Sequence, residues 1–390
     1  MSYKLAASSW GPEELDAIQR VISSDRFTMG GEVAALEEEF AAWHGMKYGV
    51  MVNSGSSANL IAVASFAYKN DNPLQRGDEV IVPAISWSTT YYPLQQYGLK
   101  LRFVDVERDS FNIDVSKLEA ALTPQTKMIV AVSILGNPAA MDQIRAFADK
   151  HGLYLMEDNC ESLGAELPDG TKTGTYGDMN TFSFFFSHHI ATMEGGMVLT
   201  DDEEYFHILR SMRNHGWTRD VPSPSPIYEE EADDFFEAYR FILPGYNVRP
   251  IEMAGAVGRE QLKKLPGYIQ ARRKNLKVFQ DLFGSDERFI IQKEYGKSST
   301  FCFPLVLNPE RNPDRKKILG ALTEADIGYR IVTGGCFPRH DVIKHFDYEI
   351  VGNIDNANIV HDYGLFLGNH PFDLNDEITE AFNIMDAAFT

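Results

Sequence analysis

The chain has 390 residues, of which 56 are acidic and 36 basic, for a formal net charge of −20. Nucleic acids and anionic membrane surfaces both select proteins with a basic face, so this balance argues against either as a partner. The length is sufficient for a large domain and a smaller companion, each with its own buried core. A single small module is excluded.

Three cysteines, Cys160, Cys302 and Cys336, stand far apart in the sequence. They are too few and too scattered for a disulfide framework, a zinc site or an iron–sulfur cluster held by four thiolates. We therefore expect reduced thiols, no metal and no cluster. The chain begins without an apolar signal core, and no apolar run approaches the ~18 residues of a membrane span, so the sequence predicts a cytoplasmic protein.

Apolar residues at helical spacing near the start of the chain predict two amphipathic helices. The two stripes consist of Leu15, Ile18 and Ile22, and of Val33, Leu36, Phe40 and Trp43. From residue 48 onward, short apolar runs alternate with helix-length stretches, which is typical of βαβ units around a mostly parallel sheet. The runs that predict strands are 48–53, 79–84, 101–106, 128–134 and 154–157.

Two further runs, 181–186 and 197–200, follow without a long helix between them, so we expect the sheet to end in a partly antiparallel region. Residues 219–236 mix prolines with acidic side chains, which favours an exposed loop acting as a flap or a subunit contact. The predicted division is an N-terminal helical segment (1–25), a large α/β domain (26–250) and a small C-terminal α+β domain (251–390).

A serine-rich turn, residues 53–59, follows the first predicted strand and precedes a helix. Free backbone amides and the helix dipole at such a helix start hold a phosphate group. Gly55, Ser56 and Ser57 are therefore candidate phosphate contacts. The alternative, an ordinary serine cap of a helix, is the more frequent one for a turn taken alone.

Three side chains beside predicted strands are further candidates. Asp158 follows the strand 154–157, at the carboxyl edge where open α/β sheets bind ligands, and a carboxylate there holds a pyridine nitrogen protonated. Trp87 follows another strand and is able to stack on a flat ring. Ser183 can offer a hydroxyl group to a phosphate. The alternatives are a helix-capping aspartate, a core tryptophan and an interior strand serine.

The segment from Thr181 to Gly196 resembles the cofactor-lysine segment of the DegT-type sugar aminotransferases, which use pyridoxal phosphate. The resemblance also covers 136–142, 213–216 and 245–249, and runs through most of residues 25–265. It implies the fold of aspartate aminotransferase, pyridoxal phosphate fold type I, with a mostly parallel mixed sheet in a large cofactor-binding domain and a smaller α+β domain. It also implies a homodimer with shared active sites.

The resemblance assigns roles to the candidate residues. It implies that Trp87 stacks on the pyridine ring, that Asp158 pairs with the ring nitrogen, and that Ser183 and the serine-rich turn hold the phosphate. Glu161 stands in the place of a family glutamine and is expected near the cofactor hydroxyl. Asn247 is expected to reach the cofactor phosphate of the other subunit.

The family's cofactor lysine falls on His188, and the chain has no lysine from residue 173 to 262. An imidazole cannot form the covalent bond that lysine makes with the cofactor. The aminated cofactor, pyridoxamine phosphate, needs no such bond and condenses directly with a keto sugar. A neutral imidazole with a pKa near 6.5 suits the removal of a proton from it, so His188 is the expected base.

With histidine in place of lysine, we expect water to be lost from the sugar instead of nitrogen being delivered to it. The electrons released by the base expel the hydroxyl group beside the former ketone. The expected products are a 3-deoxy-4-keto sugar, ammonia and pyridoxal phosphate. The resemblance implies that L-glutamate converts the cofactor back to its aminated form.

Two branches of the family carry this histidine. One adds an iron–sulfur cluster and acts on cytidine-linked sugars, and three scattered cysteines do not supply its ligands. The other needs no cluster, and the His188-His189 pair and residues 26–30 resemble it closely. This implies C3 dehydration of a GDP-linked 4-keto-6-deoxy sugar, a step of colitose biosynthesis. His189 is expected to be structural.

The sequence also offers candidate substrate contacts. The candidates are Phe27, Met29 and Gly30 for the guanosine, His215 for the substrate, and Arg219, Arg330 and Arg339 for the diphosphate. The alternatives are surface arginines without a ligand and a histidine that closes a helix. Two other functions stay open: a catalytically silent regulatory protein of this fold, and a sugar aminotransferase whose lysine has been replaced.

Overall fold

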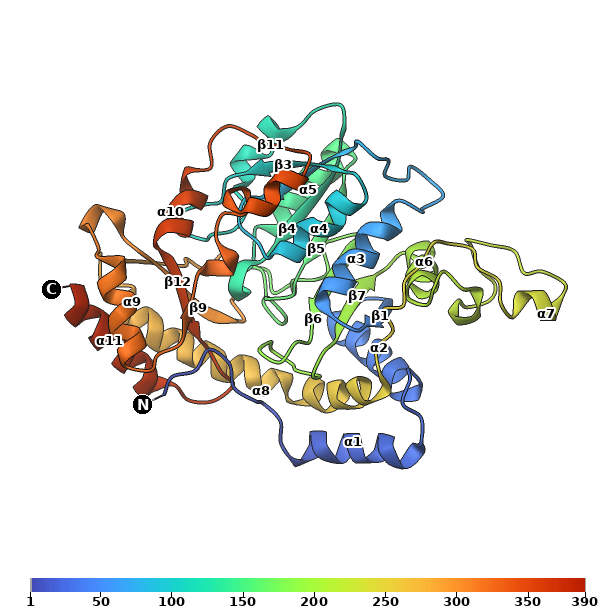
Figure 1. The fold of residues 1–390 in the computed structure, drawn as a ribbon, viewed down its shortest axis with the longest axis horizontal. Coiled ribbons are helices and arrows are strands. Elements are labelled where there is room, and N and C mark those ends of the chain that lie inside the picture. The colour runs from blue at the N-terminus through green and yellow to red at the C-terminus, as the bar shows by residue number, and fades with distance from the viewer. Residues whose placement is uncertain (1, 390) are drawn as a thin grey trace.

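The computed structural model describes residues 2–389. Figure 1 shows a large α/β body, a C-terminal lobe beside it, and a protruding arm that carries α7. The strands are β1 (Tyr48–Val52), β2 (Glu79–Pro83), β3 (Lys100–Val104), β4 (Thr126–Val132), β5 (Tyr154–Asp158), β6 (Met179–Ser183), β7 (Gly196–Thr200), β8 (Phe289–Ile291), β9 (Cys302–Leu307), β10 (Tyr329–Arg330), β11 (Tyr348–Ile350) and β12 (Gly364–Gly368). The α-helices are α1 (Pro12–Ser24), α2 (Gly31–His44), α3 (Gly55–Phe66), α4 (Ser88–Gln96), α5 (Met141–His151), α6 (Glu203–Arg213), α7 (Asp234–Glu237), α8 (Glu252–Phe283), α9 (Arg315–Glu324), α10 (Asp355–Tyr363) and α11 (Asn375–Phe389).

Within the described residues, eight strands form one sheet in the order β1-β7-β6-β5-β4-β2-β3-β11. Strand β7 is antiparallel to its neighbours β1 and β6, whereas the other pairs are parallel. All these strands except β7 therefore point the same way, and their carboxyl ends share one edge. The predicted mostly parallel mixed sheet and its antiparallel region are confirmed.

The second sheet is antiparallel, with the order β10-β12-β9-β8, and α9 and α11 belong to the same lobe. One strand of the C-terminal third does not join it: β11 pairs in parallel with β3 at the edge of the large sheet. The large sheet is therefore not built from residues 26–250 alone. The three-part domain division stays a prediction.

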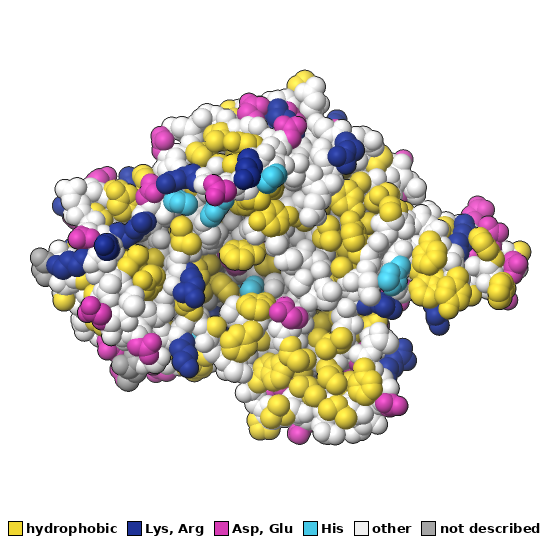
Figure 2. All heavy atoms as spheres, viewed as in Figure 1, with side chains coloured by type: hydrophobic (Ala, Val, Ile, Leu, Met, Phe, Trp, Pro, Cys, Tyr) yellow, Lys and Arg dark blue, Asp and Glu magenta, His cyan; other side chains and the backbone are white. Residues whose placement is uncertain are grey.

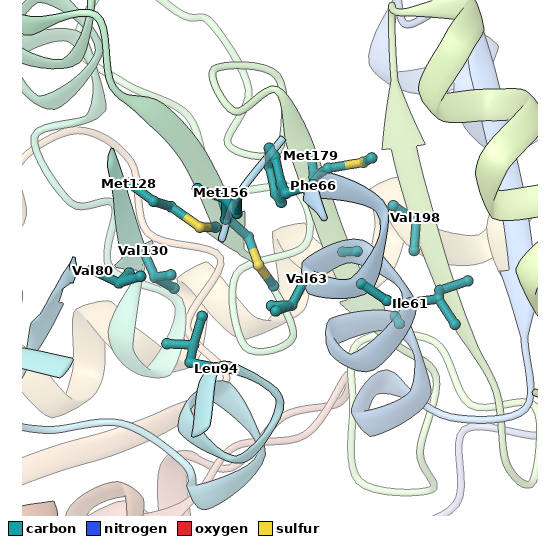
Figure 3. Close-up of a cluster of buried hydrophobic side chains, with 14 of the residues drawn as sticks. Ile61, Val63, Phe66, Val80, Leu94, Met128, Val130, Met156, Met179 and Val198 are labelled. Carbon is teal, nitrogen blue, oxygen red and sulfur yellow. The ribbon is translucent and has the colours of Figure 1, made fainter. Parts of the chain in front are cut away.

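A close-packed core lies between the large sheet and α3, α4 and α6. Figure 3 shows Val63 and Phe66 of α3 beside methionines of neighbouring strands, Met156 of β5 and Met179 of β6. Burying such a side chain contributes roughly 1.5–3 kcal/mol. Helix α3 is apolar on most sides, as a helix enclosed by a sheet and two other helices must be. This enclosure fixes the first turn of α3 at the edge of the sheet.

The predicted helices near the start of the chain are present as α1 and α2, but the stripe of α1 faces outward. Leu15 is 61% and Ile22 46% exposed, while Ala17 and Val21 pack against Ala256 of α8. An exposed apolar stripe is suited to contact with another chain. No helix in residues 2–389 is long and apolar enough to cross a membrane.

Candidate active site

Four chain segments leave the large sheet at the edge where its parallel strands end. They are the turn from β1 into α3, the turn from β2 into α4, the residues after β5, and the loop between β6 and β7. Asp158, the last residue of β5, is in register with Val132 of β4 and Thr181 of β6, so it stands near the middle of this edge. The edge is where open α/β sheets bind ligands.

Asp158 is buried, and the donors around its carboxylate are neutral. Its Oδ2 accepts hydrogen bonds from the amide Nδ2 of Asn59 at 2.9 Å and the hydroxyl of Thr90 at 2.8 Å. Its Oδ1 accepts the backbone N–H of Cys160 at 3.1 Å. A buried carboxylate held by neutral donors is fixed in orientation and is complementary to a cationic ligand such as a protonated pyridine.

The residues that orient Asp158 were not predicted from the sequence. Asn59 lies one turn after Gly55 on α3, and its Oδ1 in turn accepts the hydroxyl of Thr181 at 2.6 Å. Thr90 lies three residues after Trp87, in the first turn of α4. Their positions in the sequence could have indicated them, because Asn59 stands four residues after Gly55 and Thr90 three residues after Trp87, and residues at this spacing share a helix face.

The first turn of α3 lies against the end of β6. A Cβ placed on Gly55 would lie 2.5 Å from Cβ and 2.9 Å from Oγ of Ser183, so glycine is required for this approach. Ser54 caps the helix by accepting the N–H of Ser57 at 3.1 Å, and the Ser57 hydroxyl donates to Asn53 at 2.6 Å. The predicted phosphate contacts are thus brought together at a capped helix N-terminus.

Ser56, the third predicted phosphate contact, and Trp87, the predicted stacking residue, lie at exposed positions of the site. Ser56 donates to the hydroxyl of Thr89 at 3.2 Å, at an exposed position. Trp87 immediately precedes α4 and is 58% exposed, which excludes the alternative of a core tryptophan. An exposed indole one turn before Thr90, which donates to Asp158, provides a flat apolar surface on which a ring can stack.

Glu161 lies one turn after Asp158. Its carboxylate accepts the backbone N–H of Leu135 at 2.8 Å. Burial raises the pKa of Glu161 to about 7, helped by the negative charge of Asp158 and opposed by the Leu135 hydrogen bond. At neutral pH a large share of this carboxyl group therefore carries a proton and is able to donate a hydrogen bond, as the amide of a glutamine would.

His188 lies in the loop between β6 and β7. Its ring packs against Phe301 of the C-terminal lobe at 4.9 Å between centroids, and its Nδ1 is 3.5 Å from the hydroxyl of Ser187. Burial, together with the positive charge of Arg272, lowers the pKa of His188 to about 3. The expected pKa near 6.5 is therefore wrong, because sequence spacing reveals neither the desolvation of the ring nor the effect of the Arg272 charge on it.

His189 has a different environment from His188. It is fully buried, and its Nε2 lies 3.1 Å from the carbonyl oxygen of Ser299. This contact ties the loop to the segment that leads into β9. The arrangement agrees with the structural role that was predicted for His189.

Two predicted residues lie at the exposed margin of the same edge. The carbonyl oxygen of Val248 accepts the N–H of Asn53 at 2.9 Å, so the neighbouring Asn247 lies next to the end of β1. The side chain of Asn247 is exposed, and its Oδ1 accepts a hydrogen bond from Arg249 at 3.0 Å. His215 is exposed on the adjacent segment, where its N–H donates to the carbonyl oxygen of Tyr246 at 2.7 Å. Their contact with cofactor or substrate stays a prediction.

The arginine candidates have local partners. Arg219 stacks over Trp217 at 5.2 Å, Arg330 donates to the carbonyl oxygen of Tyr329 at 2.8 Å, and Arg339 pairs with Asp362 at 2.9 Å. None of these contacts joins an arginine to the Asp158 edge. The segment before Arg339 does reach it, because the N–H of Phe337 donates to the carbonyl oxygen of Ala84 at 2.8 Å.

The predicted guanosine contacts lie around the start of α2. The N–H of Gly30 donates to the buried carboxylate of Glu252 at 2.5 Å, and Glu252 also accepts the N–H of Glu32 at 2.7 Å. Gly30 is thereby part of a helix cap, and its amide is already used. Phe27 is 47% exposed and Met29 is partly buried against the core of α2 and α8. Nucleotide binding by these residues stays a prediction.

The residues at the sheet edge fit pyridoxal phosphate. The buried Asp158 carboxylate has neutral partners and suits a protonated ring nitrogen, and Trp87 offers a stacking surface. The close approach of Gly55 to Ser183 places a helix N-terminus beside a hydroxyl group, which suits the phosphate. The position of the family's lysine is occupied by an imidazole, so the cofactor would be held by noncovalent contacts.

The fold and the site define an aminotransferase-like α/β protein in which histidine replaces the cofactor lysine. The profile of the DegT/DnrJ/EryC1/StrS aminotransferase family matches residues 9–385, and the chain belongs to this family. It is 51% identical over 387 residues to GDP-4-keto-6-deoxy-D-mannose 3-dehydratase of Yersinia pseudotuberculosis, a match that covers 99% of this chain and 98% of that protein.

Solved structures of such dehydratases are similar over the whole chain. The E. coli GDP-4-keto-6-deoxy-D-mannose-3-dehydratase with bound hydrated pyridoxal phosphate superposes with a TM-score of 0.96 at 47% identity, covering 99% of both chains. A GDP-4-keto-6-deoxymannose-3-dehydratase with a trapped pyridoxal phosphate–glutamate geminal diamine also gives a TM-score of 0.96 at 47% identity, covering 98% of this chain and 100% of that one. The predicted family and the predicted aspartate aminotransferase-like fold are confirmed.

Proposed function

We propose that this protein removes the 3-hydroxyl group of GDP-4-keto-6-deoxy-D-mannose to give GDP-4-keto-3,6-dideoxy-D-mannose, with pyridoxal phosphate and pyridoxamine phosphate as the cofactor forms. The observation that carries the proposal is His188, an imidazole where the family has its lysine, in a site that keeps Asp158, Trp87, Ser183 and the serine-rich turn. L-glutamate is the reductant: it is oxidised to 2-oxoglutarate, and its nitrogen leaves as ammonia. The 51% identical relative supports this substrate.

When bound, the aminated cofactor supplies an amino group for the sugar ketone and a ring that accepts electrons. Asp158 holds the ring nitrogen protonated through the carboxylate that Asn59 and Thr90 orient. Trp87 fixes the plane of the ring, and Ser183 and the first turn of α3 hold the phosphate. With its pKa raised to about 7, the carboxyl group of Glu161 is protonated in a large share of the molecules at neutral pH and then donates a hydrogen bond, where the family uses a glutamine.

His188 is the base of the reaction. Burial and the positive charge of Arg272 lower the pKa of His188, so its imidazole is uncharged at neutral pH, the form that accepts a proton. The protonated ring then gives its proton to the hydroxyl group, which leaves as water. The imidazole does not retain the cofactor covalently, so ammonia is released instead of an aminosugar being formed.

The active protein is a homodimer with shared sites. Apolar side chains gather over α1 and over the arm that carries α7, two regions that Figure 2 shows as hydrophobic patches. The most exposed large apolar side chains there are Leu15, Ile22, Phe235, Phe236, Tyr239 and Phe241. Surfaces of this kind mark contacts between proteins. Asn247 and His215, exposed at the margin of the site, then face the other subunit.

The free thiols of Cys160, Cys302 and Cys336 suit a reducing compartment, which supports the cytoplasm as the place of action. Supply of the substrate then requires an enzyme of the same compartment that makes a 4-keto-6-deoxy sugar on GDP.

The proposed function is tested by incubating the purified protein, pyridoxal phosphate and glutamate with 4-keto-6-deoxy sugars linked to GDP, CDP, UDP or dTDP. We expect ammonia and 2-oxoglutarate in equal amounts with the GDP sugar, and at least tenfold slower release with the others. Equal rates with a CDP- or dTDP-linked sugar would contradict the substrate. A protein that forms no 2-oxoglutarate from glutamate would support the silent regulatory alternative.

A further inference from the structure

Besides the contacts of His188 and His189 with the segment before β9, the loop that carries His188 is held from outside at the backbone of Ala191. The indole N–H of Trp10 donates to the carbonyl oxygen of Ala191 at 2.8 Å, and the Oε1 of Gln261 accepts the Ala191 N–H at 3.2 Å. Trp10 lies in the segment before α1, and Gln261 lies on α8. Both backbone groups of Ala191 are therefore bonded to elements that are distant from the loop in the sequence.

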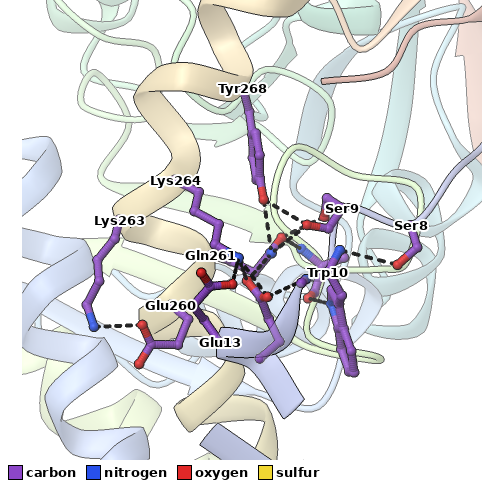
Figure 4. A network of polar contacts seen from close by, with 12 residues as sticks. Ser8, Ser9, Trp10, Glu13, Glu260, Gln261, Lys263, Lys264 and Tyr268 are labelled. Atoms are coloured by element: carbon purple, nitrogen blue, oxygen red, sulfur yellow. Dashed lines mark hydrogen bonds and ion pairs between the residues drawn. The ribbon is translucent and has the colours of Figure 1, made fainter. Parts of the chain in front are cut away.

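The two residues that hold Ala191 belong to one polar network, shown in Figure 4. Gln261 is fully buried, and its Nε2 donates to Glu14 at 2.7 Å while its Oε1 accepts the Ser9 hydroxyl at 2.8 Å. The Tyr268 hydroxyl donates to the carbonyl oxygen of Ser9 at 2.8 Å, and Lys264 pairs with the buried Glu14 at 2.7 Å. These contacts lock the amide of Gln261 in one orientation and fix the chain just before Trp10.

The loop's own backbone bonds do not fix its place relative to α8. The N–H of Phe184 donates to the carbonyl oxygen of Gly195, and the N–H of Thr192 donates to that of Phe184, both at 2.9 Å, which closes the base of the loop. The N–H of His188 donates to the carbonyl oxygen of Phe185 at 2.9 Å. The Ala191 contacts connect the loop to the segment before α1 and to the long helix beneath it.

We propose that Trp10 and Gln261 are positioning residues for His188, acting through the two backbone groups of Ala191. The inference rests on the proposed function, in which the His188 ring removes a proton at the cofactor. Proton transfer needs the ring nitrogen within hydrogen-bonding distance of the reacting carbon, and a misplacement of about 1 Å costs roughly 100-fold in rate. The substrate and cofactor contacts themselves lie on other segments, so binding is spared when the loop loosens.

Two variants separate this role from a general loss of stability. Trp10→Phe removes the indole N–H and keeps an aromatic ring, and Gln261→Met removes the acceptor for Ala191 and keeps the length of the side chain. Tyr295→Phe is the matched control, because it removes the hydrogen bond from the Tyr295 hydroxyl to Asp142 at 2.9 Å, away from the loop. Amide hydrogen exchange of residues 185–194 is measured with and without pyridoxal phosphate, next to kcat and KM for the GDP sugar.

In both variants, we expect the amide hydrogens of residues 185–194 to exchange about tenfold faster than in wild type. We expect kcat to fall roughly 10- to 100-fold and KM to stay within twofold. In Tyr295→Phe, hydrogen exchange, kcat and KM should all be unchanged. Unchanged exchange with unchanged kcat in both variants would overturn the proposal. So would a higher KM at constant kcat, or loss of folding in both variants, since the contacts would then serve substrate binding or the fold. An inactive wild-type protein would refute the proposed function, while faster loop exchange in the variants would still support the anchoring.

Discussion

His188 differs from the lysine it replaces in what its nitrogen can do. A lysine amine removes a proton and also forms a stable covalent bond with the cofactor, whereas an imidazole performs only the proton transfer. The surroundings add a second difference, because burial and Arg272 hold the ring uncharged at neutral pH. In the proposed mechanism, this one residue decides between retention of the cofactor with amination of the sugar and release of ammonia with loss of the hydroxyl group.

Replacing His188 with asparagine tests its role as the base. The amide of asparagine keeps a polar side chain of similar reach but cannot accept a proton, so we expect His188→Asn to lower ammonia release from glutamate and the GDP sugar by roughly 100- to 10,000-fold. Binding of pyridoxal phosphate, followed by its absorbance, should change by less than about twofold. Undiminished turnover in the variant would refute the assignment.

Some site residues could be predicted from the sequence because they directly follow a predicted strand, and others could not. Asp158 and Trp87 follow predicted strands, so the rule that ligands bind at the carboxyl edge of the sheet was sufficient to bring them together. Asn59 and Thr90 were missed because their role is to orient another side chain and not to contact a ligand. The pKa of His188 could not be predicted, since it depends on the packing of the loop against α8 and Phe301.

Strand β5 places two adjacent carboxylates on opposite faces of the sheet, as alternation along a strand requires. Asp158 faces the site. Glu157 is fully buried and accepts the N–H groups of Gly174 at 2.8 Å and Tyr176 at 3.2 Å. Burial raises the pKa of Glu157 to about 7, from 4.5, and these hydrogen bonds oppose the shift. The strand thus carries one carboxyl group for the ligand and one for the fold.

The raised pKa of Glu157 makes its contribution to stability dependent on pH. The folded protein binds this proton more tightly than the unfolded chain, so the contribution is full below pH 4.5 and is lost as the pH rises through 7. Glutamine does not titrate, so the difference in free energy of unfolding between Glu157→Gln and wild type should shift in favour of the variant by roughly 2–3 kcal/mol as the pH rises from 5 to 8. Urea denaturation of both proteins at each pH measures this difference. A difference between the two proteins that does not vary with pH would contradict the titration.

Element types were predictable from periodicity, but the surroundings of each element were not. The 3.6-residue spacing of Leu15, Ile18 and Ile22 predicted helix α1 correctly, yet the structure turns this stripe outward and packs Ala17 and Val21 inward. Strand β11 has too few residues to give a pattern, and its pairing with β3 joins segments about 250 residues apart in the chain. Short strands and long-range pairings have no local signal.

Two apolar surfaces of the whole molecule have no partner within a single chain among the described residues. They are the exposed stripe of α1 and the aromatic side chains of the arm that carries α7. The acidic, proline-containing segment 219–236 was predicted to be a flap or a subunit contact, and it projects from the body as the arm that carries α7 (Figure 1). A second copy that covers these surfaces would bury them and complete the two sites at Asn247 and His215.

The dimer proposal is tested by placing charge on the stripe. The double variant Leu15→Glu/Ile22→Glu should sediment as a monomer at micromolar concentration, where wild type sediments at twice that mass, and should lose most of its ammonia release because the sites are shared. Asp16→Lys changes the charge at an exposed polar position of the same helix outside the stripe and should remain a dimer. A monomeric wild type, or a double variant that remains dimeric, would contradict the interface.

Histidine at residue 188, as proposed, turns an aminotransferase site to deoxygenation. The most direct test of this role is mass spectrometry of the nucleotide sugar formed from GDP-4-keto-6-deoxy-D-mannose, glutamate, pyridoxal phosphate and the purified protein. We expect a GDP-linked keto sugar that has lost one oxygen atom, formed in equal amount with ammonia. A GDP-linked aminosugar that retains all its other hydroxyl groups, formed without free ammonia, would contradict the account.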